Sequence, residues 1–169
     1  MAEEPDSNVL IRPIGESEAI LTMPVLPADT NTYGNLFGGQ MVAWIDKVAS
    51  ITAFRHARQN VVTASIDHLD FLAPVHLGDI LTLRSALNYV GRSSMEVEVE
   101  VVTENRLTGA TQQACRALLT FVAIDENERP SPVPRLDLQT DDERRRYQQG
   151  LERCQRRREA AREAQGESS

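Results

Sequence analysis

Lysine and cysteine are scarce in this chain, and long apolar runs are missing. Lys47 is the single lysine among 18 basic residues, which indicates a bias of genome composition and says little about function. Cys115 and Cys154 are the only cysteines, so a disulfide framework and a CxxC metal site are excluded. No apolar run reaches the roughly 20 residues that a membrane-spanning helix needs. These absences favour a reducing compartment and disfavour a membrane partner.

The opening segment MAEEPDSNVL has neither the basic region nor the apolar core of a secretory signal, so we expect a cytoplasmic location. The net charge of −7 disfavours nucleic acid as a partner, because like charges repel. The charge is uneven, however. Residues 141–165 hold eight arginines and six acidic residues, whereas residues 1–139 sum to −8.

Three common motifs of nucleophiles and nucleotide sites are also missing, namely GxSxG, GxxxxGK[ST] and GxGxxG. His56, His68 and His76 do not have the spacing of a metal-binding cluster. The sequence therefore predicts no metal site.

The regular elements follow the order strand, long helix, four strands. EAILTMPVL (residues 18–26) predicts the first strand, and residues 29–37 are rich in turn-forming Asp, Asn, Thr and Gly. Residues 38–58 predict a helix that is apolar on nearly every side, which is typical of a buried helix. Strand-like runs then occupy residues 60–74, 78–90, 93–105 and 111–125.

An antiparallel sheet has an apolar face to cover, and this chain offers one apolar helix for it. The prediction is therefore an α+β fold, in which a curved antiparallel five-stranded sheet wraps round one central helix. The clearest alternation predicts a half-buried strand with valines inward and glutamates outward: Val97, Val99 and Val101 against Glu96, Glu98 and Glu100.

The two ends of the chain differ from this central part. Residues 1–16 are polar and are expected to form an N-terminal arm, and residues 17–135 the main domain. Residues 136–169 are expected to form a charged helical tail, with Thr140 as a candidate N-cap. We expect this helix to pack on an oligomer or to remain in solvent.

Asp46 interrupts the apolar helix in the stretch DTNTYGNLFGGQMVAWID. Its neighbours one turn away are small or apolar: Val42, Ala43, Ala49 and Ser50. A carboxylate on such a face is costly unless it is paired or used. Two interpretations stay open. Asp46 forms a structural ion pair with Lys47 or with an arginine at a subunit contact, or it acts as a general base, whose basicity rises with desolvation.

Glycines and small polar residues form the other candidate site positions. Gly38 and Gly39 at the helix start make a tight junction, or they expose N–H groups that bind an oxyanion. Asn31 and Asn35 are turn residues, or amides that orient water or a carbonyl group. The GRSS stretch with Arg92, Ser93 and Ser94 is a simple hairpin turn or a loop that contacts phosphate.

Four stretches together resemble the acyl-CoA thioesterases of the hotdog superfamily, in the branch of cytosolic long-chain and broad-range bacterial acyl-CoA hydrolases. They are DTNTYGNLFGGQMVAWID, VVTASIDHLDFLAPVHLGD, VGRSSMEVEVEV and FVAIDENERPSPVPRL, which span roughly residues 19–135. The tail TDDERRRYQQG is also similar to that of this branch. The resemblance implies a single hotdog unit, with a homodimer as the smallest active assembly and a hexamer, a trimer of dimers, as the usual one.

The resemblance also implies an activity, the hydrolysis of acyl-CoA to coenzyme A and a carboxylic acid without any cofactor. The catalytic pair would be Asn31 and Asp46 from opposite subunits, with Asp46 as general base, or less favourably as nucleophile. Asn31 would position water or the carbonyl group, and the Gly39 N–H would hold the oxyanion. The remaining positions would contact substrate and coenzyme A: Gly38, Thr63, Ala64, Ser65, Arg92, Ser93 and Ser94.

Two other classes compete with a hydrolase. A hotdog hydratase or dehydratase needs a histidine paired with a carboxylate, and residues 29–46 contain no histidine. A non-catalytic acyl-CoA sensor would carry a DNA-binding module, and some 16 residues before the first strand are too few for one. A hotdog protein that acts on another thioester carrier stays open as an alternative.

Overall fold

The computed structural model describes residues 10–166. The order of elements is β1 (Ile11–Pro13), η1 (Ile14–Glu16), β2 (Ala19–Pro24), η2 (Pro27–Asp29), α1 (Gly38–Ala57), β3 (Asn60–Phe71), β4 (Ile80–Val90), β5 (Ser94–Glu104), β6 (Thr111–Ile124), β7 (Arg135–Asp137) and α2 (Asp141–Gly166). The predicted strands, the central helix and the C-terminal helix are confirmed, with ends displaced by a few residues.

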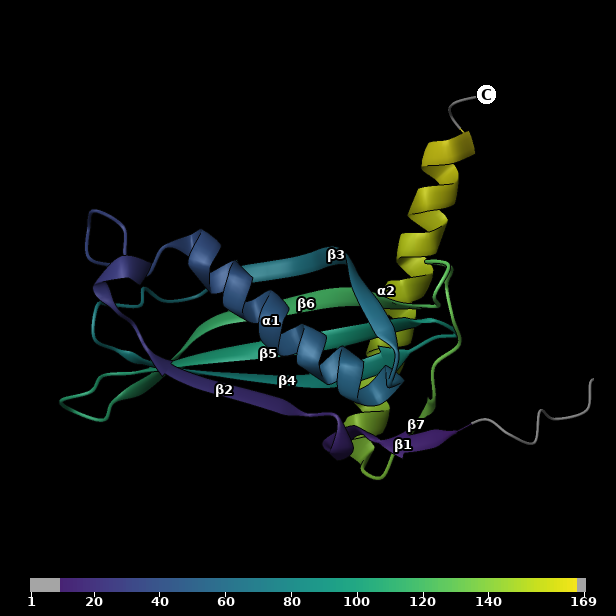
Figure 1. Cartoon of the computed structure of the whole chain (residues 1–169), viewed down its shortest axis with the longest axis horizontal. Coiled ribbons are helices and arrows are strands. Elements are labelled where there is room, and N and C mark those ends of the chain that lie inside the picture. The colour runs from purple at the N-terminus through teal and green to yellow at the C-terminus, as the bar shows by residue number, and fades with distance from the viewer. Residues whose placement is uncertain (1–9, 167–169) are drawn as a thin grey trace, which may run out of the picture.

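The main sheet has five strands in the order β2-β4-β5-β6-β3, and every neighbouring pair is antiparallel. It curves about α1, which crosses its front face in Figure 1. Between them lies the apolar core, in which Ile45 and Val48 of α1 meet Leu83, Val97 and Leu119 of the sheet. The predicted α+β hotdog architecture, with one central helix, is thus confirmed.

Helix α1 is less completely buried than its sequence predicts. It begins after Phe37, an N-cap residue whose side chain makes no capping hydrogen bond, and it ends at Arg58, which takes the left-handed conformation at φ 55°. Trp44, like Ile45 and Val48, is buried, but Phe54 remains 45% exposed. One face of an apolar helix is therefore open in the single chain.

The outward face of β5 is covered, so the prediction of solvent-facing glutamates is wrong at two of three positions. Glu96 is 1% exposed and Glu98 is 7% exposed, whereas Glu100 is exposed as expected. Helix α2 lies across this face, behind the sheet in Figure 1. Glu98 bonds Asn88 Nδ2 at 2.8 Å and pairs with Arg116, so a polar layer replaces solvent there.

Helix α2 packs on the sheet of its own chain as far as Arg157, a contact that the sequence did not predict, whereas residues 158–164 are exposed, as expected of a helix in solvent. Packing of α2 on an oligomer stays a prediction. Thr140 caps α2 as predicted, because Thr140 Oγ1 accepts from the Glu143 N–H at 3.1 Å and Glu143 Oε2 accepts from the Thr140 N–H at 3.0 Å. Its inward residues recur every three or four positions, as a packed helix face requires: Tyr147, Gly150, Arg153, Cys154 and Arg157.

Residues 11–16, which the sequence places in the N-terminal arm, form β1 and η1. Strand β1 pairs in parallel with β7, which follows the proline-rich segment 130–134. The part of the expected arm within residues 1–9 lies outside the described residues. No helix within residues 10–166 has the length and apolar character to cross a bilayer.

Candidate active site

Asp46 lies two turns into α1, half-buried, and faces strand β3. Thr63 Oγ1 of β3 donates a hydrogen bond of 2.8 Å to Asp46 Oδ1. Among residues 10–166 no donor contacts the other carboxylate oxygen, Oδ2. A carboxylate held by one oxygen and free at the other can accept a proton from a nearby water.

The structural alternative for Asp46, an ion pair, is not seen within the described chain. None of the salt bridges among residues 10–166 includes Asp46, and Lys47 is exposed to solvent. Lys47 instead contributes its carbonyl oxygen, which accepts from Ser50 Oγ at 2.8 Å. The carboxylate is thus hydrogen-bonded but not neutralised within its own chain.

Gly38 and Gly39 form the first turn of α1, whose N–H groups have no partners inside the helix. A Cβ atom at Gly39 would lie 2.6 Å from Cε1 of the Phe37 ring, and one at Gly38 would lie 3.6 Å from Cζ of Phe71. Two exposed aromatic rings therefore flank the backbone at the helix start. Glycine at position 39 leaves room for the Phe37 ring, which a Cβ atom there would displace.

Asn31 organises the loop before α1. Its Oδ1 accepts from the N–H groups of Tyr33 at 2.9 Å and Asn35 at 3.2 Å. Asn35 in turn lies against His76, with Oδ1 and Nδ1 2.7 Å apart. Sequence reasoning missed His76 at this place, because the only local signal is the turn-rich segment 72–79, some forty residues away along the chain.

A cavity of about 370 Å³ opens between this loop and α1. Asn31 and Gly38 line it together with Asn35, Leu36, Met41 and the segment Phe71–Val75. Its wall is mostly apolar, with two amide side chains at one side, a suitable form for an acyl chain that ends at a polar group.

Asn31 and Asp46 do not meet in the single chain. Asp46 is absent from the lining of the Asn31 cavity, and it lies eight residues beyond Gly38, about 12 Å along the helix at 1.5 Å per residue. The structure joins Asn31 with Gly38, and separately Asp46 with Thr63. Two half-sites are the result.

The expected coenzyme A contacts also fall into two groups. Thr63, Ala64 and Ser65 lie at a bulge of β3, where the register with β6 shifts between Thr63 and Ser65. Thr63 contacts Asp46, and Ser65 Oγ donates to Asp67 at 2.6 Å. The first of these contacts brings Thr63 to the candidate base itself.

The second group lies at the turn between β4 and β5, with Arg92 and Ser93 in the turn and Ser94 as the first residue of β5. Arg92 borders a cavity of about 740 Å³ together with Arg135 and Tyr147 and with apolar residues of 90–91 and 132–138. No acidic side chain lines this cavity. Two guanidinium groups beside an apolar floor suit a ligand that carries phosphate and a flat ring.

The histidines do not complete an acid–base pair with Asp46. His56 is wholly buried at the end of α1, and burial lowers its pKa below the usual value. His68 pairs with Asp70 at 2.7 Å. This pair faces away from the core and from Asp46, because His68 lies opposite Leu118 on β6, and the core face of β6 belongs to the neighbouring Ala117 and Leu119. Within residues 10–166, no three His, Cys, Asp or Glu residues are placed to hold a metal ion.

Comparison with known proteins points in one direction. Residues 33–110 match the model of the thioesterase superfamily. A protein of Bacillus subtilis described as an uncharacterised acyl-CoA thioester hydrolase is 43% identical over 150 residues, which are 89% of this chain and 87% of that protein.

Solved structures agree with this. An apo-hexameric acyl-CoA thioesterase superposes with a TM-score of 0.86 at 42% identity, over 90% of this chain and 98% of that one. An acyl-CoA hydrolase from Staphylococcus aureus, solved with butyryl coenzyme A, coenzyme A and coenzyme A disulfide, has a TM-score of 0.84 at 37% identity, over 92% and 95% of the two chains. The chain belongs to the acyl-CoA thioester hydrolases of the thioesterase superfamily and has their hotdog fold.

Proposed function

We propose that this protein hydrolyses acyl-CoA thioesters, with Asp46 as the general base. The observation that carries the proposal is the half-buried Asp46 carboxylate, which is fixed by Thr63 on one oxygen and open on the other. A sensor that only binds acyl-CoA would not need a carboxylate of this kind. An activity on another thioester carrier stays the alternative.

The relatives support the choice of residues. The Staphylococcus aureus acyl-CoA hydrolase has been solved as three single variants, in which an asparagine, an aspartate and a threonine are each replaced by alanine. Their order and spacing are those of Asn31, Asp46 and Thr63 in this chain. This match favours the same three residues here.

The chemistry follows from the groups present. Water attacks the carbonyl carbon of the thioester while its proton passes to Asp46 Oδ2, and the carbonyl electron pair moves to oxygen. The Gly39 N–H at the start of α1 binds this oxyanion, a contribution of about 3–4 kcal/mol to lowering the barrier. The carbon–sulfur bond then breaks, and the coenzyme A thiolate takes the proton from Asp46. Asn31 orients the water or the carbonyl group.

The site is proposed to form between two chains. In one chain Asn31 and Gly38 border a cavity that Asp46 does not reach, so a partner chain is needed to bring the two halves together. Exposed apolar side chains of α1 and the edge strand β3 offer the surface for this contact: Ile51, Phe54, Val62 and Ile66. A homodimer is then the smallest active unit, and three dimers would form a hexamer like those of related thioesterases.

Coenzyme A is proposed to lie along β3 and the turn after β4. Thr63 and Ala64 would face the pantetheine arm, and Arg92, Ser93 and Ser94 the nucleotide, whereas the Ser65 hydroxyl bonds Asp67 on the other face of β3. The cavity beside Arg92 supports this placement, because two arginines and no acid line it. A cytosolic location belongs to the proposal as well, because a mouse relative is a cytosolic acyl coenzyme A thioester hydrolase.

The test is thiol release from a ladder of acyl-CoAs of increasing chain length, measured for the wild type and Asp46→Asn. We expect turnover by the wild type and its loss in the variant, since an amide accepts no proton at neutral pH. Asp142→Asn, an exposed carboxylate of α2, is the matched control. Full activity of Asp46→Asn, or a wild type that binds every acyl-CoA without hydrolysis, would overturn the proposal.

A further inference from the structure

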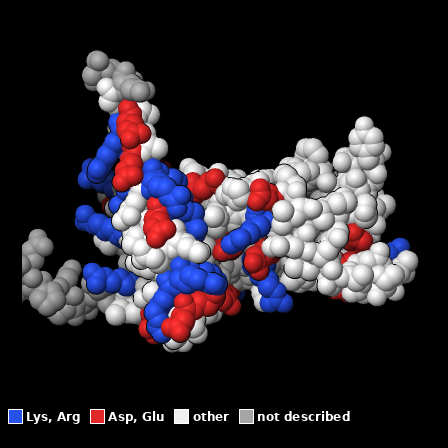
Figure 2. All heavy atoms as spheres, turned by 180° about the vertical axis from the view of Figure 1, so that it is seen from behind, with Lys and Arg blue, Asp and Glu red and all other residues white. Residues whose placement is uncertain are grey.

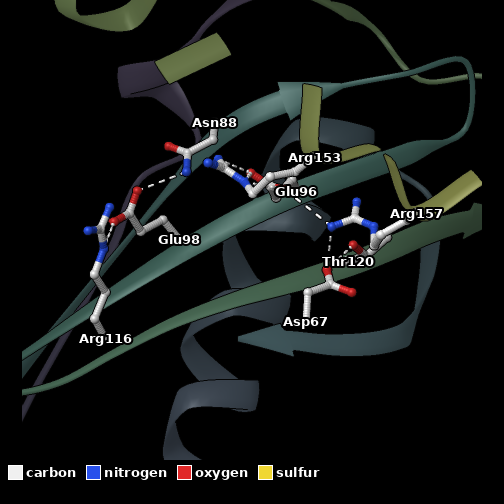
Figure 3. A network of polar contacts seen from close by, with 8 residues as sticks. All are labelled: Asp67, Asn88, Glu96, Glu98, Arg116, Thr120, Arg153 and Arg157. Carbon is white, nitrogen blue, oxygen red and sulfur yellow. Dashed lines mark hydrogen bonds and ion pairs between the residues drawn. The ribbon is translucent and has the colours of Figure 1, made fainter. Parts of the chain in front are cut away.

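Two arginines of α2 reach the back of the sheet through a network of polar contacts, drawn in Figure 3. Arg153 donates hydrogen bonds to both carboxylate oxygens of the buried Glu96 of β5. Its Nη2 lies 2.6 Å from Oε1, and its Nε lies 3.2 Å from each oxygen. These hydrogen bonds raise the pKa of Arg153 above its ordinary value. Arg157, one turn later, contacts Glu96 at 3.4 Å and Asp67 of β3 at 2.9 Å.

Asp67 is the point at which three donors converge. Its Oδ2 accepts from Arg157 Nη1 at 2.9 Å and from Thr120 Oγ1 at 2.5 Å, and its Oδ1 accepts from Ser65 Oγ at 2.6 Å. The side chain is only 11% exposed. Arg157 is the only one of the three donors that carries charge, and a carboxylate this little hydrated depends on it.

The bulges of β3 place this acid and the candidate active site on opposite faces of one strand. In a regular strand, positions four apart such as 63 and 67 face the same way. Strand β3 shifts register against β6 between Thr63 and Ser65 and again between Ile66 and His68. As a result, Thr63, which precedes the first bulge, faces α1 and Asp46, whereas Asp67, which follows it, faces α2.

Contacts other than those of Arg157 also hold α2 on the sheet. Arg153 already pairs with both oxygens of Glu96, and Gly150 brings the helix close to Tyr89. What Arg157 adds is a bond from α2 to the bulged segment 63–67. This segment lies on the edge strand of the sheet, and β6 is its only hydrogen-bonded neighbour strand within the described chain.

We propose that Arg157 is a positioning residue for the Asp46 site. Through Asp67 it holds the bulged segment 63–67 in the conformation that aims the Thr63 hydroxyl at the Asp46 carboxylate. Arg157 touches neither substrate nor base, and its effect passes through Thr63. This inference rests on the proposed function, since it assumes that Asp46 is the base.

The experiment compares Arg157→Met, Thr63→Val and the double variant by kcat, KM and melting temperature. We expect Arg157→Met to lower kcat on the order of tenfold, because small displacements at a reacting centre are costly, with a smaller rise in KM, since Thr63 is also proposed to face pantetheine. In the Thr63→Val background the same substitution should cost nothing further. Effects that multiply in the double variant would show a merely structural role and overturn the proposal.

Three further variants make the result specific. Arg157→Lys keeps the charge and should restore part of kcat, whereas Arg156→Met removes an exposed neighbouring charge and should leave kcat unchanged. If Arg157→Met does not fold, Asp67→Asn removes the same ion pair and should lower kcat alike. A wild type whose turnover depends on Asp46 but not on Arg157 or Asp67 overturns this inference alone, and loss of the Asp46 dependence overturns the proposed function with it.

Discussion

His56 at the end of α1 lies 2.8 Å through Nε2 from the carbonyl oxygen of Pro134, in the segment that leads to β7. The ring is completely buried, and Ser17 Oγ lies 3.4 Å from its Nδ1. Burial is the main cause that lowers the pKa of His56; the hydrogen bond to Pro134 raises it in part, and nearby Arg12 lowers it again. The neutral ring thus ties the central helix to the C-terminal segment.

This arrangement predicts a loss of stability in mild acid. The pKa of His56 in the folded chain lies below the 6.5 of an ordinary histidine, so the unfolded chain takes up the proton first. The contribution of His56 is complete above pH 6.5 and declines as the pH falls below it. Urea unfolding between pH 7.5 and 5 should show this decline.

His56→Gln keeps a donor near Pro134 but cannot titrate. We expect a flatter dependence of unfolding free energy on pH in this variant, even if it is less stable at pH 7. Equal slopes in His56→Gln and the wild type would contradict the assignment.

The close approach of α2 to β4 gives a second prediction. A Cβ atom at Gly150 would lie 2.6 Å from Cβ of Tyr89 and 3.1 Å from Oε1 of Glu96. Alanine gains about 1 kcal/mol over glycine from helix propensity, but overpacking costs about 1–3 kcal/mol. Overpacking should prevail, because the Tyr89 Cβ atom is fixed to the strand and cannot swing away.

Gly150→Ala is therefore expected to lower the free energy of unfolding and the melting temperature. Gly166→Ala, where an added Cβ would meet nothing within 4 Å, is the control and should not destabilise. A more stable Gly150→Ala chain would mean that α2 does not pack on Tyr89 as described.

Most of the fold could be predicted, because the alternation of apolar and polar residues shows which side chains of a strand face the core. Val97, Val99 and Val101 face the core as their alternation indicates. The same alternation cannot say what covers the other face, since glutamates pair with water or with arginines alike. The Glu96–Arg153 pair joins residues 57 positions apart, and a contact over such a separation cannot be predicted from the periodicity of a single element.

The candidate site divides in the same way. Local motifs singled out Asp46 and the glycines before it, but the Thr63–Asp46 contact joins a helix and a strand across 17 positions, which no local motif contains. The separation of Asn31 from Asp46 is likewise a property of the folded chain. Figure 2 shows blue and red side chains side by side over α2, as on a solvated helix. The opposite face of α2 is nevertheless packed, since Gly150 and Cys154 are buried.

The cysteines give a prediction that also bears on the assay. Burial raises the pKa of Cys115 to about 11, so only about one thiol in a thousand is ionised at pH 8. Both cysteines are free and buried. The native protein should therefore react very slowly with a disulfide-forming reagent such as DTNB, whereas both thiols should react at once in guanidinium chloride. A fast-reacting thiol in the native state would contradict the burial of these side chains.

The cavity beside Arg92 predicts which part of the substrate it contacts. Arg92→Met should raise KM for an acyl-CoA about tenfold or more, because a hydrogen bond to a charged group contributes about 1.5–3 kcal/mol. It should leave KM for the same acyl group on pantetheine, which lacks the nucleotide, nearly unchanged. Equal effects on both substrates would place the nucleotide elsewhere.

The separation of Asn31 from Asp46 predicts complementation between inactive chains. Asn31→Ala and Asp46→Ala homo-oligomers should each lose nearly all turnover. If the site contains Asn31 of one chain and Asp46 of the other, a heterodimer of the two variants holds one intact site and one doubly damaged site. Mixing after unfolding, with distinct affinity tags to isolate heterodimers, should restore about half of the wild-type activity per dimer. Mixing two Asp46→Ala preparations in the same way is the control and should restore none. Verified heterodimers without activity would mean that both residues act within one chain, and the cavity beside Asn31 would then have to close onto Asp46 by a movement of the loop before α1.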